Sequence, residues 1–395
     1  MSHRTAGRRR RLIPLVLATT ATQASIVVLV PILAEIGRDL GASVSATGQA
    51  RTILAATAVM ASLAIGPLID RLGVRPLIIW GGALALAGAA ATAAAPSLAF
   101  FYAAHVLTGL GVACLLSAGF AGVAAWFDDR DGPWAVGYVV AAQSVAWLVG
   151  NPIVGLLSEL GSWRLGYLVP GAFALLALAA GLAAPRTRPV RAPDARSGLA
   201  AVLRDPSARA WTLAELVAYS AWTAELTYAG AFYVQSYGVS EAGVGLLLAV
   251  GSLAFMFATL RTARLAERFD RRRLIVVSAL VMGLMLVPIL NLTPSVWFTL
   301  GLFFVMAMFA GVRSTGASAL GLSQLPDQAG SMMAARTASA QLGYMAGAGA
   351  GGLVLALGGF GALGFALCAG MVASAALIAR VSDPRAAQVL APRSR

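Results

Sequence analysis

Ionisable side chains lie inside long apolar stretches of the sequence, where a charge is difficult to accommodate. The strongest candidates among them are Glu215, Glu225, Arg313 and His105. A charged group at the centre of a bilayer costs at least about 2.5–3.5 kcal/mol unless it is paired or hydrated, so such groups often mark a functional site. Glu225, His105 and Glu215 are the candidates for carrying a proton, because carboxyl and imidazole groups can bind and release one. A structural Glu–Arg pair and a packed histidine are the alternatives.

Neutral polar and aromatic side chains in the same stretches form a second group of candidates, for binding a small molecule. Amide and indole groups can orient a ligand through hydrogen bonds, and aromatic rings can line an apolar site. Hydrogen bonding between helices and ordinary ring packing are the alternative explanations. The candidates for a substrate cavity are Gln23, Gln143, Asn151, Trp147, Tyr219, Trp222, Tyr228 and Arg313.

The elements that must position these residues are membrane-spanning helices. The sequence is 59% hydrophobic and 11% charged, whereas soluble domains carry about 25% charged residues. Its mean hydropathy is +0.81. Apolar runs of about 20 residues recur along the whole chain, the length at which a helix crosses about 30 Å of hydrocarbon. We predict twelve spans, at 12–34, 47–69, 76–95, 98–124, 134–157, 164–184, 211–236, 243–262, 274–291, 295–324, 331–356 and 360–380.

The arginines predict how these helices are oriented. All 29 basic residues are arginine, and most of them fall on the same side as the N-terminus. Positive residues concentrate on the cytoplasmic side of membrane proteins. We therefore expect a multi-pass protein of the cytoplasmic (inner) membrane with both termini in the cytoplasm, and no nucleic-acid partner. The exceptions are three arginines in outer segments and two within predicted helices, namely Arg38, Arg51, Arg164, Arg313 and Arg336.

A segment rich in proline and arginine divides the chain into two halves. It separates six apolar runs from six others and is too polar to cross a membrane. A faint internal repeat supports the division, because an acid and arginines follow the second run at Asp70 and the eighth run at Asp270. We predict an N-terminal six-helix half at 1–184, a cytoplasmic linker at 185–210, a C-terminal six-helix half at 211–380 and a cytoplasmic tail at 381–395.

The turn between the second and third runs carries the most specific motif. It reads Gly66-Pro67-Leu68-Ile69-Asp70-Arg71-Leu72-Gly73-Val74-Arg75, with the spacing G-x-L-x-D-R-x-G-x-R. This motif resembles the cytoplasmic loop between helices two and three of the major facilitator superfamily. With the number of spans, the orientation and the central linker, the resemblance covers nearly the whole chain. It implies an all-α membrane protein of twelve transmembrane helices in two six-helix halves.

The same resemblance implies a conformational switch in this loop. Asp70 would face the start of the eleventh helix and help to hold the outward-facing state, with Arg336 as a second candidate partner. Glycines at both ends of the motif would allow a close approach and a tight turn. The family often has a basic residue at the position of Val74, and Arg75 retains one charge here. The switch candidates are Gly66, Asp70, Arg71, Gly73, Arg75 and Arg336.

Two further motifs of the family are only partly present. Proton-coupled members often carry R-x-x-x-G-x-G in the fourth helix, and the stretch His105 to Gly111 has histidine in place of the arginine. Antiporter-type members carry G-P-x-x-G-G in the fifth helix, and the stretch from Asn151 to Leu156 keeps the proline and one glycine. These departures leave the coupling residue and the direction of transport open.

The resemblance is greatest to the twelve-span drug/proton antiporter branch. It implies export of a small amphipathic compound by proton-coupled alternating access, with protons and the lipid bilayer as partners and a monomeric protein. The alternatives are an importer or facilitator of a small metabolite and, more distantly, a non-transporting receptor or a membrane-embedded enzyme. The sequence has no Walker motif, paired catalytic carboxylates or Ser-His-Asp arrangement, and only two histidines. We therefore expect neither an enzyme nor an ATP-driven pump, and no cofactor or metal.

Overall fold

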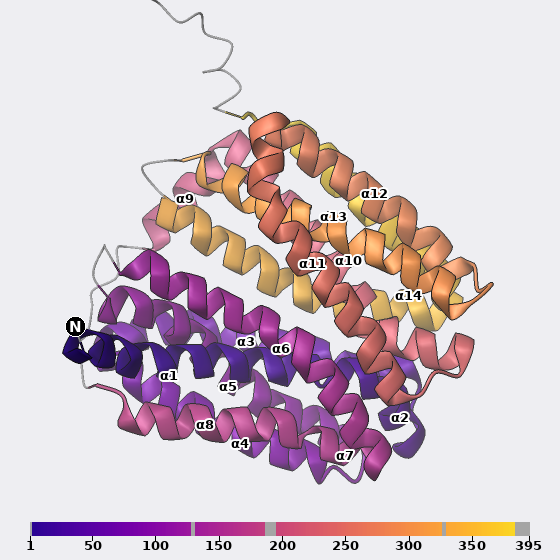
Figure 1. The fold of residues 1–395 in the computed structure, drawn as a ribbon, viewed down its shortest axis with the longest axis horizontal. Helices are drawn as coiled ribbons and strands as arrows, with labels where there is room; N and C mark the ends of the chain where they lie inside the picture. Colours follow the sequence, from indigo (N-terminus) through magenta and orange to yellow (C-terminus); the bar gives the residue numbers. More distant parts are fainter. Residues whose placement is uncertain (1, 128–130, 186–194, 326–328, 384–395) are drawn as a thin grey trace, which may run out of the picture. The chain divides into compact units, whose positions relative to one another are not determined.

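The chain folds into helices. The computed structural model describes residues 2–127, 131–185, 195–325 and 329–383, and these residues form helices and no strand (Figure 1). The helices are α1 (Ser2–Val27), α2 (Leu29–Asp39), α3 (Val44–Leu72), α4 (Val74–Ala93), α5 (Leu98–Trp126), α6 (Gly132–Leu160), α7 (Trp163–Gly166), α8 (Leu168–Ala183), α9 (Ala195–Arg204), α10 (Pro206–Tyr237), α11 (Glu241–Arg268), α12 (Arg271–Asn291), α13 (Val296–Leu322) and α14 (Ala329–Ala379).

These helices account for the twelve predicted spans. By length and composition, eight helices in the described residues can cross a membrane, or nine when α1 and α2 are taken as one span bent by 42°. Helix α14 is 51 residues long and contains Gly359 at φ 70°, so it covers the eleventh and twelfth predicted spans on either side of a kink. Helices α3 and α10, with 29 and 32 residues, cover the second and seventh predicted spans.

The bend between α1 and α2 lies where a proline interrupts the backbone hydrogen bonds. Helix α1 ends at Val27, and Pro31 is the third residue of α2. Proline has no N–H to donate to the carbonyl four residues earlier, here that of Val27, and its ring crowds this carbonyl. The break at Val28 divides the first span.

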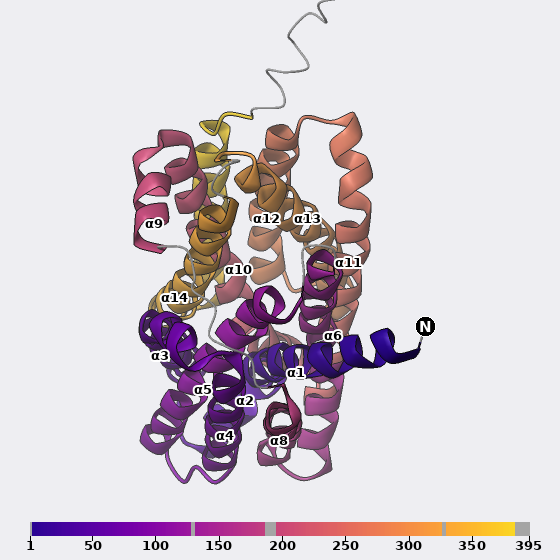
Figure 2. The same cartoon turned by 90° about the vertical axis from the view of Figure 1, so that its left-hand side faces the viewer.

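The chain forms two compact units. The first unit contains the described residues up to 185 together with 227–249, and the second contains 195–226 and 250–383. In the first unit α4 packs between α5 and α8, as Figure 2 shows nearly along the helix axes. Its core includes Leu15, Leu77 and Leu115, none of which is exposed. The core of the second unit gathers around Trp211 and Leu320.

The segment 227–249, where α10 ends and α11 begins, belongs to the first unit through close helix contacts. A Cβ added at Gly230 would meet the carbonyl oxygen of Val30, and one at Gly245 would meet that of Asn151. Arg38 and Glu241 form an ion pair across the same contact, at 2.8 Å. Glycine is needed at both positions because the helix backbones approach so closely.

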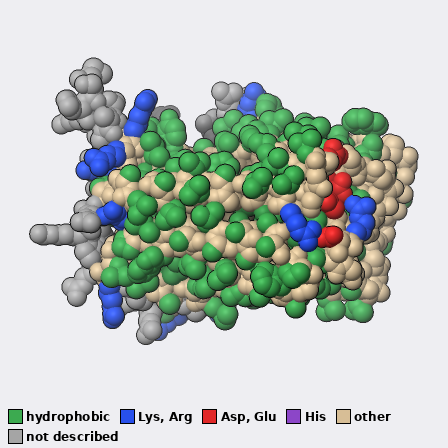
Figure 3. All heavy atoms as spheres, turned by 90° about the horizontal axis from the view of Figure 1, so that it is seen from below, with side chains coloured by type: hydrophobic (Ala, Val, Ile, Leu, Met, Phe, Trp, Pro, Cys, Tyr) green, Lys and Arg blue, Asp and Glu red, His purple; other side chains and the backbone are tan. Residues whose placement is uncertain are grey.

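The distribution of charge on the surface matches a membrane protein. Figure 3 shows one face whose middle is covered by hydrophobic side chains, with basic side chains at one end and a mixed group of acidic and basic side chains at the other. An apolar zone between two charged ends fits a bilayer between two aqueous surfaces.

Candidate functional site

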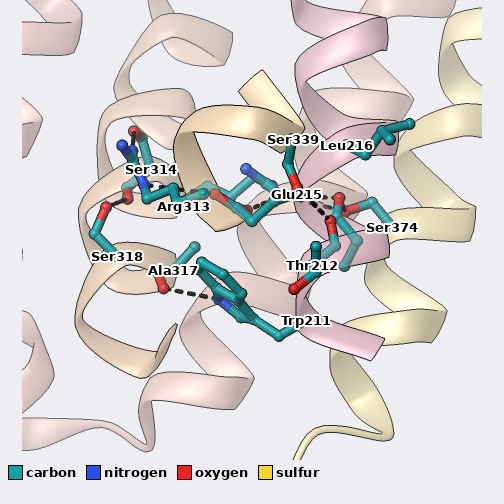
Figure 4. A network of polar contacts seen from close by, with 12 residues as sticks. Trp211, Thr212, Glu215, Leu216, Arg313, Ser314, Ala317, Ser318, Ser339 and Ser374 are labelled. Carbon is teal, nitrogen blue, oxygen red and sulfur yellow. Dashed lines mark hydrogen bonds and ion pairs between the residues drawn. The ribbon is translucent and has the colours of Figure 1, made fainter. Parts of the chain in front are cut away.

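A buried ion pair lies at the centre of the second unit. Nη2 of Arg313, on α13, lies 2.7 Å from Oε1 of Glu215, on α10 (Figure 4). The arginine side chain is 6% exposed and the glutamate side chain is fully buried. Of the two glutamates on α10, the structure pairs Arg313 with Glu215 and not with Glu225. This pair corresponds to the structural alternative, because each charge is compensated by the other.

A second arginine lies near the same carboxylate. Nε of Arg336, on α14, is 3.9 Å from Oε2 of Glu215, and its Nη2 donates to Oγ of Ser314 at 3.4 Å. The guanidinium group also lies 5.7 Å from the centre of the Tyr219 ring. Two cations therefore share one buried anion, and the group of Glu215, Arg313 and Arg336 has a net positive charge.

Small residues and hydroxyl groups hold this charged group in place. Ser374 Oγ donates to the carbonyl oxygen of Ala214 at 2.9 Å, and Arg313 Nη2 donates to the same serine at 3.3 Å. Helix α14 lies against α10 because Gly343 and Gly347 have no side chain to separate them; a Cβ at Gly343 would come within 2.6 Å of Tyr219 Cβ. These two glycines therefore allow the backbones of α10 and α14 to approach closely.

Glu225 is a buried carboxyl group outside this ion-pair group. It lies on α10 and is 3% exposed. Among the residues that the structure describes, none makes a hydrogen bond to its Oε2 atom. Trp222, one turn earlier, stacks on Phe255 with ring centres 6.3 Å apart. A buried carboxyl oxygen with no protein partner can accept a proton without breaking an existing contact.

The first unit contains a network of polar side chains that the sequence analysis named separately. Nε1 of Trp147 donates to Oε1 of Gln23 at 2.9 Å, and Nε2 of Gln23 donates to Oε1 of Gln143 at 3.1 Å. Asn151 donates to the carbonyl oxygen of Trp147 at 2.9 Å. The structure thus joins α1 to α6 through three of the predicted cavity residues, Gln23, Gln143 and Trp147, while the bond of Asn151 lies within α6.

Arg51 belongs to the same region, which corrects its predicted place. We expected Arg51 in an outer segment, but it lies on α3 and is 4% exposed. Its guanidinium carbon is 5.9 Å from the centre of the Trp147 ring. Tyr228, which is 1% exposed, packs on Gly48 one turn before Arg51. The position of Arg51, a few residues inside an apolar run, was the available signal in the sequence.

His105 has the surroundings of a packed residue. It lies on α5, is 2% exposed, and its Nδ1 is 2.8 Å from the carbonyl oxygen of Phe101. The two rings are 4.4 Å apart. Because the nitrogen that bonds the carbonyl must carry a hydrogen, this geometry favours the packing alternative over proton transfer.

The turn between α3 and α4 is one residue long. Gly73 has φ 80°, a conformation that residues with a side chain rarely adopt, and its N–H donates to the carbonyl of Ile69 at 2.8 Å. Arg75 donates from Nε and Nη2 to the carbonyls of Gly181 and Leu182, at 3.2 and 2.8 Å. These bonds cap the C-terminal end of α8, where positive charge is favoured.

For two of the other switch candidates, the structure describes the backbone and not the side chain. Arg71 is exposed, and Gly66 and Asp70 lie on α3 with side chains outside the described residues. The contact between Asp70 and the start of the eleventh span therefore stays a prediction.

We expect the Asp70→Asn variant to transport several-fold more slowly than the wild type while remaining folded and inserted. Asparagine keeps the size of the side chain but removes the charge that a helix N-terminus favours. Initial rates in vesicles, normalised to the amount of folded protein by gel filtration, measure the effect. Wild-type turnover would show that Asp70 is a solvated loop charge. Glu159→Gln, which makes the same chemical change at an exposed acid at the end of α6, is the control and should transport like the wild type.

Comparisons with known proteins agree with this architecture. The family model for the Major Facilitator Superfamily matches residues 15–236 and 211–395. Monocarboxylate transporter 3 of Rattus norvegicus is 34% identical over 148 residues, which cover 37% of this chain and 30% of the relative. Multidrug resistance protein D of Escherichia coli K12 is 30% identical over 198 residues, 47% of either chain. The matches therefore span less than half the length of these relatives.

A solved structure resembles nearly the whole chain. A bacterial homologue of the human lysosomal transporter Spinster, in an inward-facing and unoccupied conformation, has a TM-score of 0.74 with coverage of 94% of both chains. The identity is 15%, so the likeness concerns the fold. Among the described residues, no group of three or more His, Cys, Asp or Glu side chains is placed to hold a metal ion.

Proposed function

Because the chain belongs to the major facilitator superfamily, we propose that it is a proton-coupled secondary transporter that exports a small amphipathic compound. Membership of this transporter family and the all-α membrane fold confirm two predictions of the sequence analysis. The observation that carries proton coupling is Glu225, a buried carboxyl group in a membrane-spanning helix whose Oε2 has no partner among the described residues.

Glu225 is the strongest of the three proton-carrying candidates. Glu215 is held by Arg313 at 2.7 Å, so protonating it would leave a buried arginine without its counter-ion. His105 is fixed by Phe101 on its own helix. A carboxyl group whose surroundings alternate between dry and hydrated states changes its proton affinity, and this change can couple proton flow to transport.

Uptake or facilitated diffusion of a small metabolite is the second candidate function. It is favoured by the relatives that are named monocarboxylate transporters, whereas the relative named a multidrug resistance protein favours export. Inverted and right-side-out vesicles, each tested with and without a pH gradient against a panel of compounds, separate the two. Substrate accumulation in inverted vesicles that is abolished by collapsing the pH gradient supports proton-coupled export. Substrate movement that does not depend on the pH gradient contradicts it.

We also propose that the protein is a monomer in the cytoplasmic membrane with both termini inside. Single cysteines placed in 190–196 should react only with a cytoplasmic reagent, and those placed in 238–241 only with an external one. The distribution of arginines is the physical reason, because positive residues stay on the cytoplasmic side. Cys114 and Cys368 are replaced by alanine beforehand, since both are free thiols. Labelling of 190–196 from outside would contradict the orientation.

A further inference from the structure

The polar network of the first unit includes a buried positive charge. Arg51 on α3 is 4% exposed and lies over the ring of Trp147 on α6. Trp147 in turn is bonded to Gln23 on α1. An arginine in a spanning helix is costly, and such residues usually face a functional pathway. Three helices therefore bring one cation and two amide side chains together inside the membrane.

The order of donors in this network fixes the orientation of both amide groups. An indole nitrogen can only donate a hydrogen bond, so the oxygen of Gln23 must face Trp147, at 2.9 Å. The nitrogen of Gln23 then faces Gln143, whose oxygen must accept, at 3.1 Å. The Nε2 group of Gln143 is consequently left at the end of the chain as a donor of hydrogen bonds.

The network thus ends in donors and carries positive charge. Arginine supplies N–H groups in a planar fork that fits the two oxygens of a carboxylate, and Gln143 adds a neutral donor. Arg51 repels an ammonium ion because both are positively charged. The free amide group of Gln143 also offers an ammonium ion no acceptor, since that ion carries only hydrogen-bond donors. The rings of Trp147 and Tyr228 are the aromatic surfaces beside Arg51, and the Tyr228 ring packs on Gly48 one turn away.

We propose that Arg51, with Gln143 oriented by Gln23 and Trp147, binds the carboxylate group of the transported compound. This inference rests on the proposed transport function and narrows the substrate to an amphipathic organic anion. Arg51 is a substrate-binding residue in this scheme, whereas Gln23 is a positioning residue that acts through Gln143. Cationic amphipathic compounds are excluded from the site by the charge of Arg51.

Binding to the purified full-length protein in lipid nanodiscs tests the proposal without any need for transport. The probes are hexanoate and phenylacetate, with hexanamide and phenylacetamide as neutral partners of the same shape. Thermal stabilisation and quenching of tryptophan fluorescence report binding. We expect at least one carboxylate to bind more tightly than its amide. Equal binding of each acid and its amide, or no binding of either acid, would overturn the proposal.

Variants assign the binding to the named side chains. Arg51→Gln should weaken carboxylate binding about 10- to 100-fold, the effect of losing a charged hydrogen-bonded partner, and Arg51→Lys should weaken it less. Gln143→Leu should lower affinity while retaining the preference for the acid. Arg261→Gln, which removes an exposed arginine that lies over Phe257, is the matched control. Unchanged carboxylate binding in Arg51→Gln would overturn the proposal.

The two proposals fail in distinguishable ways. Should Arg51→Gln not fold, Arg51→Lys and Gln143→Leu measure the same dependence, and undiminished carboxylate binding in both would overturn the inference. Export of neutral or cationic compounds by a protein that binds no carboxylate would overturn the carboxylate site and leave proton-coupled export standing. Carboxylate binding that depends on Arg51, in a protein that moves no compound across vesicles, would overturn the transport function alone.

Discussion

Vesicles that contain the Glu225→Gln variant will exchange substrate down its gradient but will not accumulate it when a pH gradient is imposed. Glutamine keeps the shape and the hydrogen-bonding oxygen of the side chain but cannot take up a proton at that oxygen. If Glu225 carries the transported proton, the variant separates substrate movement from proton movement. The measurement is the ratio of internal to external substrate at steady state, which should fall to about one in the variant.

The same chemical change at a water-exposed acid is the control. Glu159→Gln alters a carboxylate that is exposed at the end of α6 and accepts the N–H of Ala242 at 3.2 Å, a bond that an amide oxygen can also accept. It should accumulate substrate like the wild type. Accumulation by Glu225→Gln with an unchanged pH response would contradict the assignment of Glu225. A uniporter, or coupling through Glu215 or Glu35, would then be the better account.

His105→Ala completes this test. The hydrogen bond from His105 to Phe101 and the contact between their rings lead us to expect a lower melting temperature and no change in the pH dependence of transport. A shifted pH dependence in this variant would restore the imidazole to the coupling mechanism.

The spans and the tight turn were predictable from the sequence because their causes are local. A helix needs about 20 apolar residues to cross the bilayer, and that requirement is visible without tertiary structure. Gly73 likewise reveals its turn, since a positive φ favours glycine and the structure gives φ 80° at that position. Even the bend at Val28 has a local signal, in Pro31, which cannot donate a hydrogen bond to the carbonyl of Val27.

The partners within the sites were not predictable, because they depend on which helices face one another. Glu225 and Glu215 lie on the same helix, and the sequence gives no means of deciding which of them meets Arg313; the structure selects Glu215. Arg51 was assigned to an outer segment because it lies near the end of an apolar run, where a helix boundary cannot be placed within a few residues. Its burial depends on α6 and the Trp147 ring.

Replacing Arg313 by leucine should destabilise the protein more than any other single change at an ion pair described above. The substitution leaves Glu215 fully buried without its partner at 2.7 Å, and breaking a buried pair costs about 3–5 kcal/mol. Arg38→Leu is the matched control, because its pair with Glu241 has an arginine side chain that is 67% exposed. Exposed pairs contribute about 0–1 kcal/mol. The melting temperature of the purified protein, and its unfolding in denaturant, measure both.

A second substitution tests whether the loss of stability in Arg313→Leu arises from the uncompensated charge of Glu215. Combining Arg313→Leu with Glu215→Leu removes both charges of the 2.7 Å pair and leaves only Arg336, whose side chain is 21% exposed, so the double variant should recover part of the stability that Arg313→Leu loses. Packing loss alone predicts the opposite, since removing a second side chain would add to the damage. A double variant that is less stable than Arg313→Leu would therefore contradict the charge explanation.

Arg336 limits how much stability the Arg313→Leu variant loses. Its Nε lies 3.9 Å from the same carboxylate, and its side chain is 21% exposed, so it has room to move toward Glu215 when Arg313 is absent. Either arginine alone can partly neutralise Glu215. The variant that lacks both arginines should therefore lose more free energy of unfolding than the two single variants lose together. A double-mutant cycle of Arg313→Leu and Arg336→Leu measures this coupling. Strict additivity would show that Arg336 does not compensate Glu215, and that the buried charge depends on Arg313 alone.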